Sequence, residues 1–426
     1  MINMPNRTQA PKIKSVDALD LTKPIRHRLD NGIPVYELNM GTQDVVKLEI
    51  VFNAGRPYEI KKLAARSTVA SLKEGTKSYD GNKIAEHMDF FGGSVSMPFS
   101  LDVAQIVIYS LTRHFEDIIP VVAEMITTPT FPQKELDSFV RQNQQRLQVD
   151  LSKNDVVAYR MLTEYIFGAE HPYGYNSYPE TYGELSRADL LDHFKRCYTS
   201  GNCHVFISGK TNDAILKVLN QHLGQAIPKG QLPTPDMRVT PAKPQSVRIK
   251  NPGTVQSAIR IGRQLFSRNH PDYMGLYVLN TIFGGYFGSR LMHNIREDKG
   301  YTYNIYSMLD ALRWDGSFYI STEVGTPFVE PTLAEIYTEM DRLQQELISH
   351  EELEITRNFL LGHFLGMLDG PFNVSEVSKM MVLDGLPFDH FADFIEVIKT
   401  ITPQELQALA QKYLQREDMW EVVVGE

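Results

Sequence analysis

The sequence predicts an α+β protein with two homologous domains, each a mainly antiparallel β-sheet with helices packed on it. In each half of the chain, short strand-like patterns come before longer helical ones, an order that favours antiparallel sheets over a doubly wound parallel sheet. The same order of patterns then repeats after residues 227–244, a polar stretch with five prolines. Such a stretch is typical of an interdomain linker.

The first half opens with an expected hairpin at 25–38 around Asn31-Gly32, a dipeptide that favours a type I′ turn. Asp80 is the expected N-cap of a helix that runs through Phe91 and ends at Gly92-Gly93. The other strands of this half are expected at 45–53, 94–97, 102–111 and 203–208, and its other helices at 61–73, 113–127, 132–150, 154–167, 185–198 and 212–223.

The second half repeats this order. Its strands are expected at 246–250, 257–263, 301–308, 316–323 and 420–424, and its helices at 270–284, 287–298, 330–348, 350–368, 374–385, 389–400 and 403–415. Gly93 matches Gly300 at an offset of 207, and Leu136 matches Leu353 at an offset of 217. Similar offsets indicate duplication of one domain. The predicted organisation is an N-terminal extension (1–24), a first domain (25–226), a linker (227–244) and a second domain (245–426).

Composition excludes several classes of function. The 426 residues are 42% hydrophobic and carry a net charge of −9, without a basic stripe of the kind that binds nucleic acid or anionic membranes. No run of about 18 apolar residues is present, and residues 1–21 lack the apolar core of a signal peptide. A cytoplasmic protein is expected. Cys197 and Cys203 have neither redox nor zinc-finger spacing and are expected to be reduced, buried thiols.

Four segments in a fixed order carry a family resemblance. They are residues 29–35 (LDNGIPV), 54–59 (AGRPYE), 74–76 (EGT) with 91–93 (FGG), and 287–291 (FGSRL) with 295–303 (IREDKGYTY). The last is the most specific. Together they resemble landmarks of the pitrilysin/insulinase-type metallopeptidases, in the mitochondrial-processing-peptidase-like branch whose subunits carry two domains. The resemblance covers roughly residues 25 to 425 and implies that fold.

Active members of this family carry H-x-x-E-H on a first-domain helix, where two His bind zinc and the Glu is the general base. Alignment on Gly75-Thr76 places Arg66, Val69 and Ala70 at these three positions. Arg stays protonated and has no lone pair to give, and Val and Ala have no donor atoms. The family's third ligand falls near residues 145–147, where no Asp or Glu is found. We therefore expect no metal in this chain, and zinc in a partner subunit.

The other histidines do not rebuild such a site. None of the 12 lies in H-x-x-E-H or H-x-x-x-H. His350 and Glu354 are one helical turn apart and are expected on a solvated helical face. His171, in the sequence HPYG, is expected to be structural.

Arg296 and Tyr303 lie in the second-domain signature. The resemblance implies that they face the zinc site across the central cavity and bind the substrate carbonyl and its developing oxyanion. Guanidinium and phenol groups are suitable donors for an oxyanion. The alternative is that Arg296 pairs with a carboxylate and Tyr303 is a half-buried strand residue.

The resemblance also implies that substrate adds as a strand to a sheet edge in the first domain. That edge corresponds to Ser94, Val95, Ser96 and Met97. Pro98 follows directly and lacks the N–H of a ladder bond, which puts peptide binding here in doubt or protects an exposed edge.

The leading hypothesis is a non-catalytic subunit of a two-chain zinc metallopeptidase, inactive alone, that supplies Arg296 and Tyr303 to a homologous partner bearing H-x-x-E-H. The second is a non-enzymatic peptide-binding or scaffold protein of the same fold. A peptidase with an unrecognised site is the third, although no G-x-S-x-G elbow or phosphate loop is present. The sequence does not identify the partner or the peptide, and it leaves open whether the chain forms a homodimer.

Overall fold

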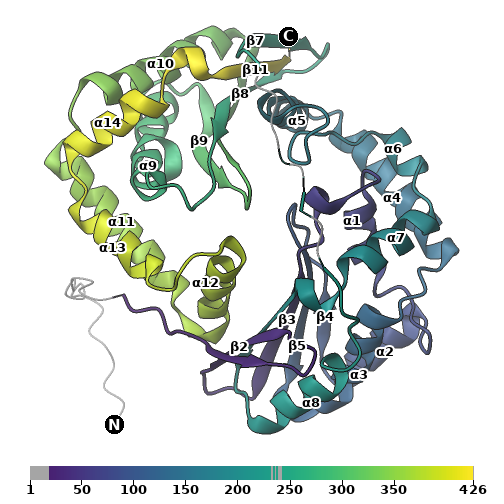
Figure 1. Ribbon diagram of the computed structural model, residues 1–426. Coiled ribbons are helices and arrows are strands. Elements are labelled where there is room, and N and C mark those ends of the chain that lie inside the picture. Colours follow the sequence, from purple (N-terminus) through teal and green to yellow (C-terminus); the bar gives the residue numbers. More distant parts are fainter. Residues whose placement is uncertain (1–18, 232–233, 236, 238–241, 426) are drawn as a thin grey trace, which may run out of the picture.

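A computed structural model describes residues 19–231, 234–235, 237 and 242–425 (Figure 1). The remaining parts of the predicted N-terminal extension and linker lie outside the described residues. Within the described range the chain forms two sheets with many helices, and the ribbons of the two halves are arranged as a ring in Figure 1. The α+β fold class is confirmed.

The first sheet has six strands in the order β1-β2-β6-β3-β5-β4. Neighbouring strands are antiparallel except β2 and β6, which run parallel. The strands are β1 (Ile25–Arg28), β2 (Pro34–Asn39), β3 (Val45–Phe52), β4 (Ser94–Ser96), β5 (Ala104–Leu111) and β6 (Cys203–Gly209). The helices of this half are α1 (Ala64–Ser71), α2 (Gly81–Phe90), α3 (Phe115–Thr127), α4 (Gln133–Asp150), α5 (Asn154–Phe167), α6 (Pro179–Gly183), α7 (Arg187–Cys197) and α8 (Asp213–Leu223).

The second sheet has five strands in the order β7-β11-β8-β10-β9. They are β7 (Ser246–Lys250), β8 (Gln256–Leu265), β9 (Thr302–Ala311), β10 (Gly316–Gly325) and β11 (Trp420–Gly425). The order matches β2-β6-β3-β5-β4 strand for strand, and the parallel pair β7–β11 corresponds to β2–β6. The two halves are therefore copies of one design, and β4 and β9 are equivalent edge strands.

The helices of the second half are α9 (Tyr273–Asn280), α10 (Val329–Gln345), α11 (His350–Met367), α12 (Gly370–Asp384), α13 (His390–Thr400) and α14 (Pro403–Tyr413). Two segments, Thr281–Gly285 and Met292–Asp298, are π-helical. Short π-helical turns occur often at functional sites, and the second carries Arg296.

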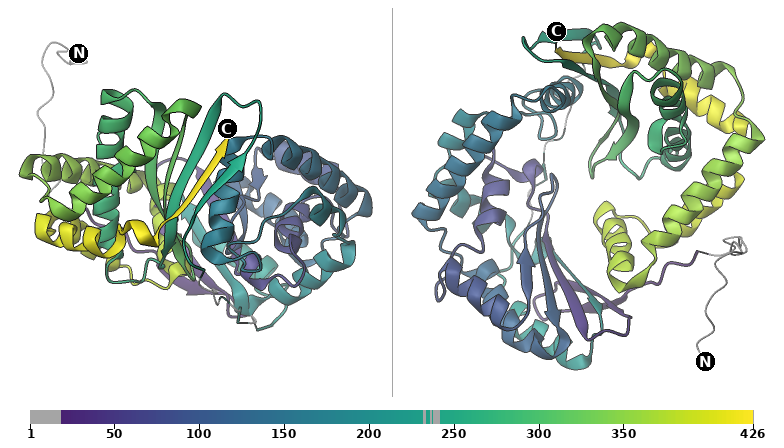
Figure 2. Two further views of the ribbon diagram at one scale, coloured as in Figure 1. Left: turned by 90° about the horizontal axis from the view of Figure 1, so that it is seen from above. Right: turned by 180° about the vertical axis from the view of Figure 1, so that it is seen from behind.

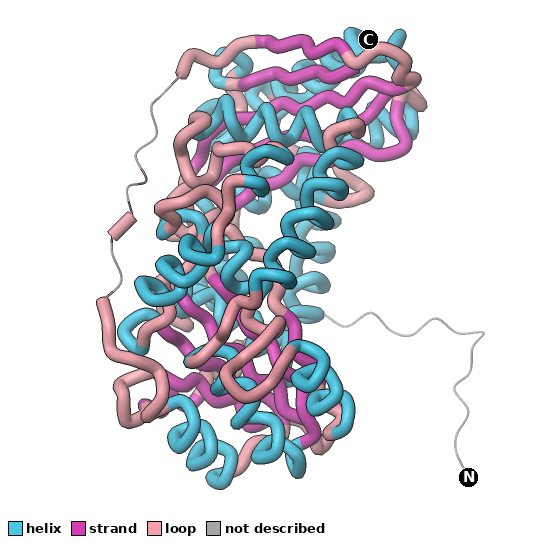
Figure 3. The backbone as a smooth tube through the Cα atoms, turned by 90° about the vertical axis from the view of Figure 1, so that its right-hand side faces the viewer, coloured by secondary structure: helices cyan, strands magenta, loops and turns pink. Residues whose placement is uncertain are grey.

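Each half buries its own hydrophobic core, and the halves also exchange helices. Helix α5 of the first half packs on β8 and β11, where Leu162 joins a buried cluster with Ala258 and Val422. Helix α12 of the second half packs on β2 and β6, where Val382 meets Phe206. The views in Figures 2 and 3 show the two sheets as separate groups of strands with helices around them. The exchange ties the two halves together at two places.

Most predicted elements are confirmed within a few residues, including the Asp80 cap, whose carboxylate accepts from the Lys83 N–H at 2.9 Å. The type I′ turn is wrong. Gly32 has a φ of +92°, but Asn31 is not among the described non-glycine residues with positive φ. Helix α1 begins three residues later than predicted because Leu63 adopts a left-handed conformation. The sequence analysis also missed α6.

None of the helices in the described part of the chain has the length and apolar character needed to cross a bilayer. Cys197 and Cys203 are both buried thiols, as predicted.

Candidate functional site

Helix α1, which carries the zinc-motif positions, is held at its start by the turn at residues 54–59. The Glu59 carboxylate accepts hydrogen bonds from the Ala65 N–H at 2.8 Å and from the Tyr175 hydroxyl at 2.7 Å. Burial raises the pKa of Glu59 above its ordinary value. Arg56 from the same turn lies 4.1 Å over the Tyr175 ring. The loop around Tyr175 therefore fixes both the turn and the first residues of α1.

Arg66, the residue at the first ligand position, makes packing and hydrogen-bonding contacts instead of facing a metal site. Its Nη2 donates to Asn143 Oδ1 on α4 at 3.3 Å, and its guanidinium carbon lies 5.2 Å from the Phe99 ring centroid. Val69 is buried and Ala70 is partly buried. Leu147, one turn after Asn143 on α4, is the residue among 145–147 that packs against the core of the first half.

These residues do not fit zinc, because a guanidinium, an amide and aliphatic side chains replace the imidazoles and carboxylates that bind it. Across the residues that the structure describes, His, Cys, Asp and Glu form no group of three or more that could hold a metal ion.

The remaining histidine candidates have structural contacts. His171 accepts from the Tyr173 N–H at 3.1 Å, its Nε2 lies 3.1 Å from the Met237 carbonyl oxygen, and its ring stacks on Phe167. Glu354 is bound by Arg357 at 2.5 Å on the surface of α11, where His350 is exposed.

Arg296 lies between two exposed aromatic rings. Its guanidinium carbon is 4.8 Å from the Tyr303 ring centroid and 5.0 Å from that of Phe287. Tyr303 is 84% exposed and Phe287 60% exposed. Within the described residues no carboxylate forms an ion pair with Arg296, and Tyr303 is not half-buried. The ion pair expected for Arg296 and the half-burial expected for Tyr303 in the structural alternative are therefore wrong.

The predicted peptide-binding residues lie at the edge of the first sheet. Ser94, Val95 and Ser96 form β4, which pairs only with β5 in the part of the chain that the structure describes, and Met97 follows it. The side chains of Val95 and Met97 pack against the buried Ile84, Val121 and Met125. One edge of β4 is therefore available to pair with another strand along its three residues, and Pro98 limits how far such pairing could continue.

The structure brings the predicted residues together in two groups. Arg66 touches Phe99, two residues beyond Met97, so the zinc-motif helix lies beside the end of the predicted peptide edge. Arg296 and Tyr303 form the other group with Phe287, in the second half. Figure 1 shows α1 and β9 on opposite sides of the middle of the ring. Sequence reasoning missed Asn143 and treated residues 287–291 mainly as a landmark; the aromatic Phe287 inside that landmark was the available signal.

Several known proteins are similar to this chain in sequence and in fold. A family model described as peptidase M16 inactive domain matches residues 184–360. An uncharacterized zinc protease, YmxG of Bacillus subtilis, is 23% identical over 351 residues, covering 81% of this chain and 84% of the relative. A non-peptidase homolog, YmxG of Helicobacter pylori, is 25% identical over 298 residues, covering 68% of each chain.

A solved structure of a peptidase M16 inactive domain from Pseudomonas fluorescens superposes with a TM-score of 0.86 at 23% identity, covering 94% of this chain and 98% of the other. The chain therefore shares the fold of this M16 structure. The chain is similar to proteins of this pitrilysin/insulinase-type family, and the positions that correspond to its zinc motif carry Arg66, Val69 and Ala70.

Proposed function

We propose that this chain is the non-catalytic subunit of a two-chain zinc metallopeptidase. The observation that carries the proposal is the contrast between the two halves. The zinc-motif positions of the first half hold no metal donor, whereas Arg296 in the second half is stacked between exposed rings without a carboxylate partner among the described residues.

In this proposal Arg296 and Tyr303 act in the site of a homologous partner chain that carries H-x-x-E-H and holds the zinc. Stacking against two ring faces leaves the in-plane N–H groups of the guanidinium available as donors. With the Tyr303 hydroxyl, they hydrogen-bond the substrate carbonyl and stabilise the negative charge that develops on its oxygen. Neither chain alone has both halves of such a site.

The test is peptide cleavage by the chain mixed with a co-encoded H-x-x-E-H homologue. Arg296→Ala and Tyr303→Phe should each lower kcat/KM of the mixture about 10²–10³-fold, as removal of an oxyanion donor does, mainly through kcat. Arg26→Ala is the control, because Arg26 also lies over a tyrosine ring, that of Tyr36, and is in the first half of the chain. Wild-type rates for the Arg296 and Tyr303 variants, with complex formation intact, would rule out the assigned roles.

The second candidate is a non-enzymatic peptide-binding or scaffold protein of the same fold. Pro98 at the end of β4 favours it, as does the non-peptidase homolog among the relatives. In that case the mixture gains no peptidase activity, while the two chains still associate. A homodimer of this chain would likewise contain no zinc motif. We propose a cytoplasmic location for either function, which fractionation of the native cells tests.

A further inference from the structure

Helix α11 has an apolar face that the other residues described by the structure leave uncovered. Leu353, Leu360 and Phe364 lie on its buried face in the core of the second half. Elsewhere on the helix, Ile355 is 52% exposed, Phe359 40% and Leu365 51%. A surface helix normally turns polar residues outward, so this much exposed apolar area indicates a binding surface.

Two glycines open a groove on this face. Gly362 and Gly366 are one turn apart, and a Cβ at either position would meet no atom within 4 Å. Packing within the described chain therefore does not require glycine here, although each glycine in a helix interior costs about 1 kcal/mol relative to alanine. The groove between α11 and α12 measures about 580 Å³. Beside the two glycines it is lined by three apolar residues and three polar ones: Met367, Val377, Met380, His363, Asn373 and Glu376. That size suits a peptide side chain or a small ligand.

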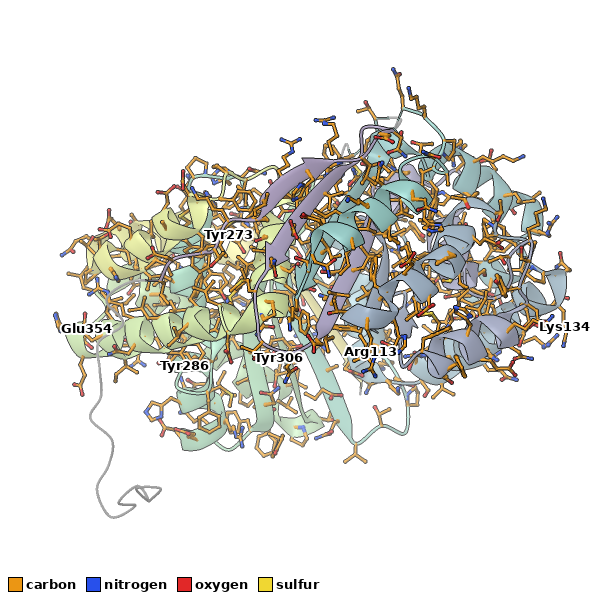
Figure 4. The ribbon with its side chains drawn as sticks, turned by 90° about the horizontal axis from the view of Figure 1, so that it is seen from below. Arg113, Lys134, Tyr273, Tyr286, Tyr306 and Glu354 are labelled. Carbon is orange, nitrogen blue, oxygen red and sulfur yellow. The ribbon has the colours of Figure 1, made fainter. Side chains whose placement is uncertain are left out.

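Ring contacts connect this groove to Tyr286, the residue that precedes Phe287 in the chain. His363, which also lines the groove, stacks with Phe359 at 6.4 Å between ring centroids, and Phe359 stacks with Tyr286 at 4.6 Å. Tyr286 is followed in the chain by Phe287, the ring under Arg296. Figure 4 labels three residues that follow one another across the second half in that view: Glu354 on α11, then Tyr286, then Tyr306 on β9. We call these residues the aromatic track: His363, Phe359, Tyr286, Phe287, Arg296 and Tyr303.

We propose that the aromatic track and the glycine groove bind an extended peptide through its apolar side chains. Ring faces and the flexible thioethers of Met367 and Met380 accept apolar side chains of different shapes. The two glycines let a peptide main chain approach the helix closely. At the other end, the guanidinium of Arg296 is complementary to a peptide carbonyl or carboxylate.

This inference rests on the proposed function in its use of Arg296. It adds the substrate class: peptides with apolar side chains at a distance from the bond to be cut. Binding energy from such a remote contact positions the substrate and favours apolar over polar peptides.

The test is fluorescence polarisation with the full chain alone and two labelled peptides of equal length and charge. One peptide alternates leucine with serine, and the other has serine throughout. The leucine peptide should bind at least about tenfold more tightly, the difference expected from burying even one large apolar side chain.

Phe359→Ala and Gly366→Leu should each weaken binding of the leucine peptide about tenfold, the first by removing a ring and the second by filling the groove. Phe90→Ala is the control, because Phe90 is 82% exposed on α2 of the first half. Melting temperatures of all variants show whether folding is retained.

Equal binding of the two peptides, or wild-type affinity in both groove variants, would overturn the inference. If Phe359→Ala changes the oligomeric state in light scattering and leaves peptide affinity unchanged, the face is an interface between copies and the inference is also overturned. The two proposals can fail separately. If the chain binds the leucine peptide more tightly but its mixture with the H-x-x-E-H homologue cleaves no peptide, this binding site is supported and the proposed function is not.

Discussion

Arg66 shows at the scale of one residue how a metal position becomes a structural one. Its side chain bridges α1 to Asn143 of α4 and covers Phe99. Leu147, one turn along α4, packs into the core instead of carrying a carboxylate. At the positions where the resemblance predicts zinc ligands in active relatives, Arg66 and Leu147 thus make contacts that stabilise α1 and α4.

This contact predicts which substitutions rebuild the metal site. The variant Arg66→His, Val69→Glu, Ala70→His and Leu147→Glu supplies the family's ligand types from α1 and from the facing turn of α4. It should bind zinc at one ion per chain, measured by mass spectrometry of the metal after dialysis. The triple variant without Leu147→Glu should retain less than half as much. Absence of zinc in the fourfold variant would mean that the alignment of α1 is wrong.

His193 is a second residue whose environment has a measurable consequence. It is fully buried, and its Nε2 lies 2.9 Å from the Ala54 carbonyl oxygen at the start of the turn that holds α1. Burial lowers the pKa of His193 from 6.5 to about 4. The folded protein therefore holds the neutral imidazole, whereas the unfolded chain takes up a proton below pH 6.5.

The sign of the pH dependence follows from that depressed pKa. The stability contribution is complete above pH 6.5 and is lost as the pH falls toward 4, by about 3 kcal/mol at pH 4 for His193. Urea unfolding of the wild type at pH 7 and pH 4 measures the total loss. His193→Asn should show a loss smaller by this amount. An identical pH dependence in the variant would contradict the assignment.

Among the elements, α12 is held on the first sheet by a buried ion network. Lys379 of α12 donates to Glu49 of β3 at 2.5 Å and lies 2.8 Å from Glu376, which also binds Lys47 of β3. Lys47, Glu49 and Lys379 are all less than 10% exposed. Burial alone would lower the pKa of Lys47, but the Glu49 and Glu376 carboxylates outweigh it and hold that pKa above its ordinary value.

Breaking this network should be costly, because without Lys379 the carboxylates of Glu49 and Glu376 share a single lysine, Lys47. Lys379→Met should lower the free energy of unfolding by about 3 kcal/mol, the cost of removing one member of a buried ion pair. The double variant Lys379→Met, Glu49→Gln keeps Lys47 paired with Glu376 and should recover most of the loss. Urea denaturation followed by circular dichroism compares them, and hydrogen exchange should show lost protection in α12. A double variant no more stable than the single one would refute charge imbalance as the cause.

Element boundaries followed from local patterns, but some conformations depend on distant contacts. The Asn31-Gly32 pair predicted the hairpin and not its turn type. Asn31 instead donates its side-chain amide to the Leu223 carbonyl oxygen at 2.9 Å, 192 residues away. The π-helical turn Met292–Asp298 has the apolar spacing of an ordinary helix, so periodicity could not reveal it. The exposure of Tyr303 likewise depends on β9 being an edge strand.

The whole molecule is a duplicated design whose halves exchange helices. Two matched residues at offsets of 207 and 217 predicted the duplication, and the equivalent strand orders confirm it. The exchange of α5 and α12 could not be predicted, since each helix has a pattern that fits its own half equally well. The positions of the motifs predicted which helix or strand carries each candidate residue. They could not predict side-chain contacts between elements far apart in the sequence, such as that of Arg66 with Asn143.

The proposed division of labour between the halves can be tested directly. Zinc content and peptide cleavage are determined for the purified chain alone and for its mixture with a co-encoded H-x-x-E-H homologue. We expect no zinc and no cleavage for the chain alone. In the mixture we expect cleavage that exceeds the homologue's own rate and depends on Arg296. Stoichiometric zinc with cleavage by this chain alone would contradict it.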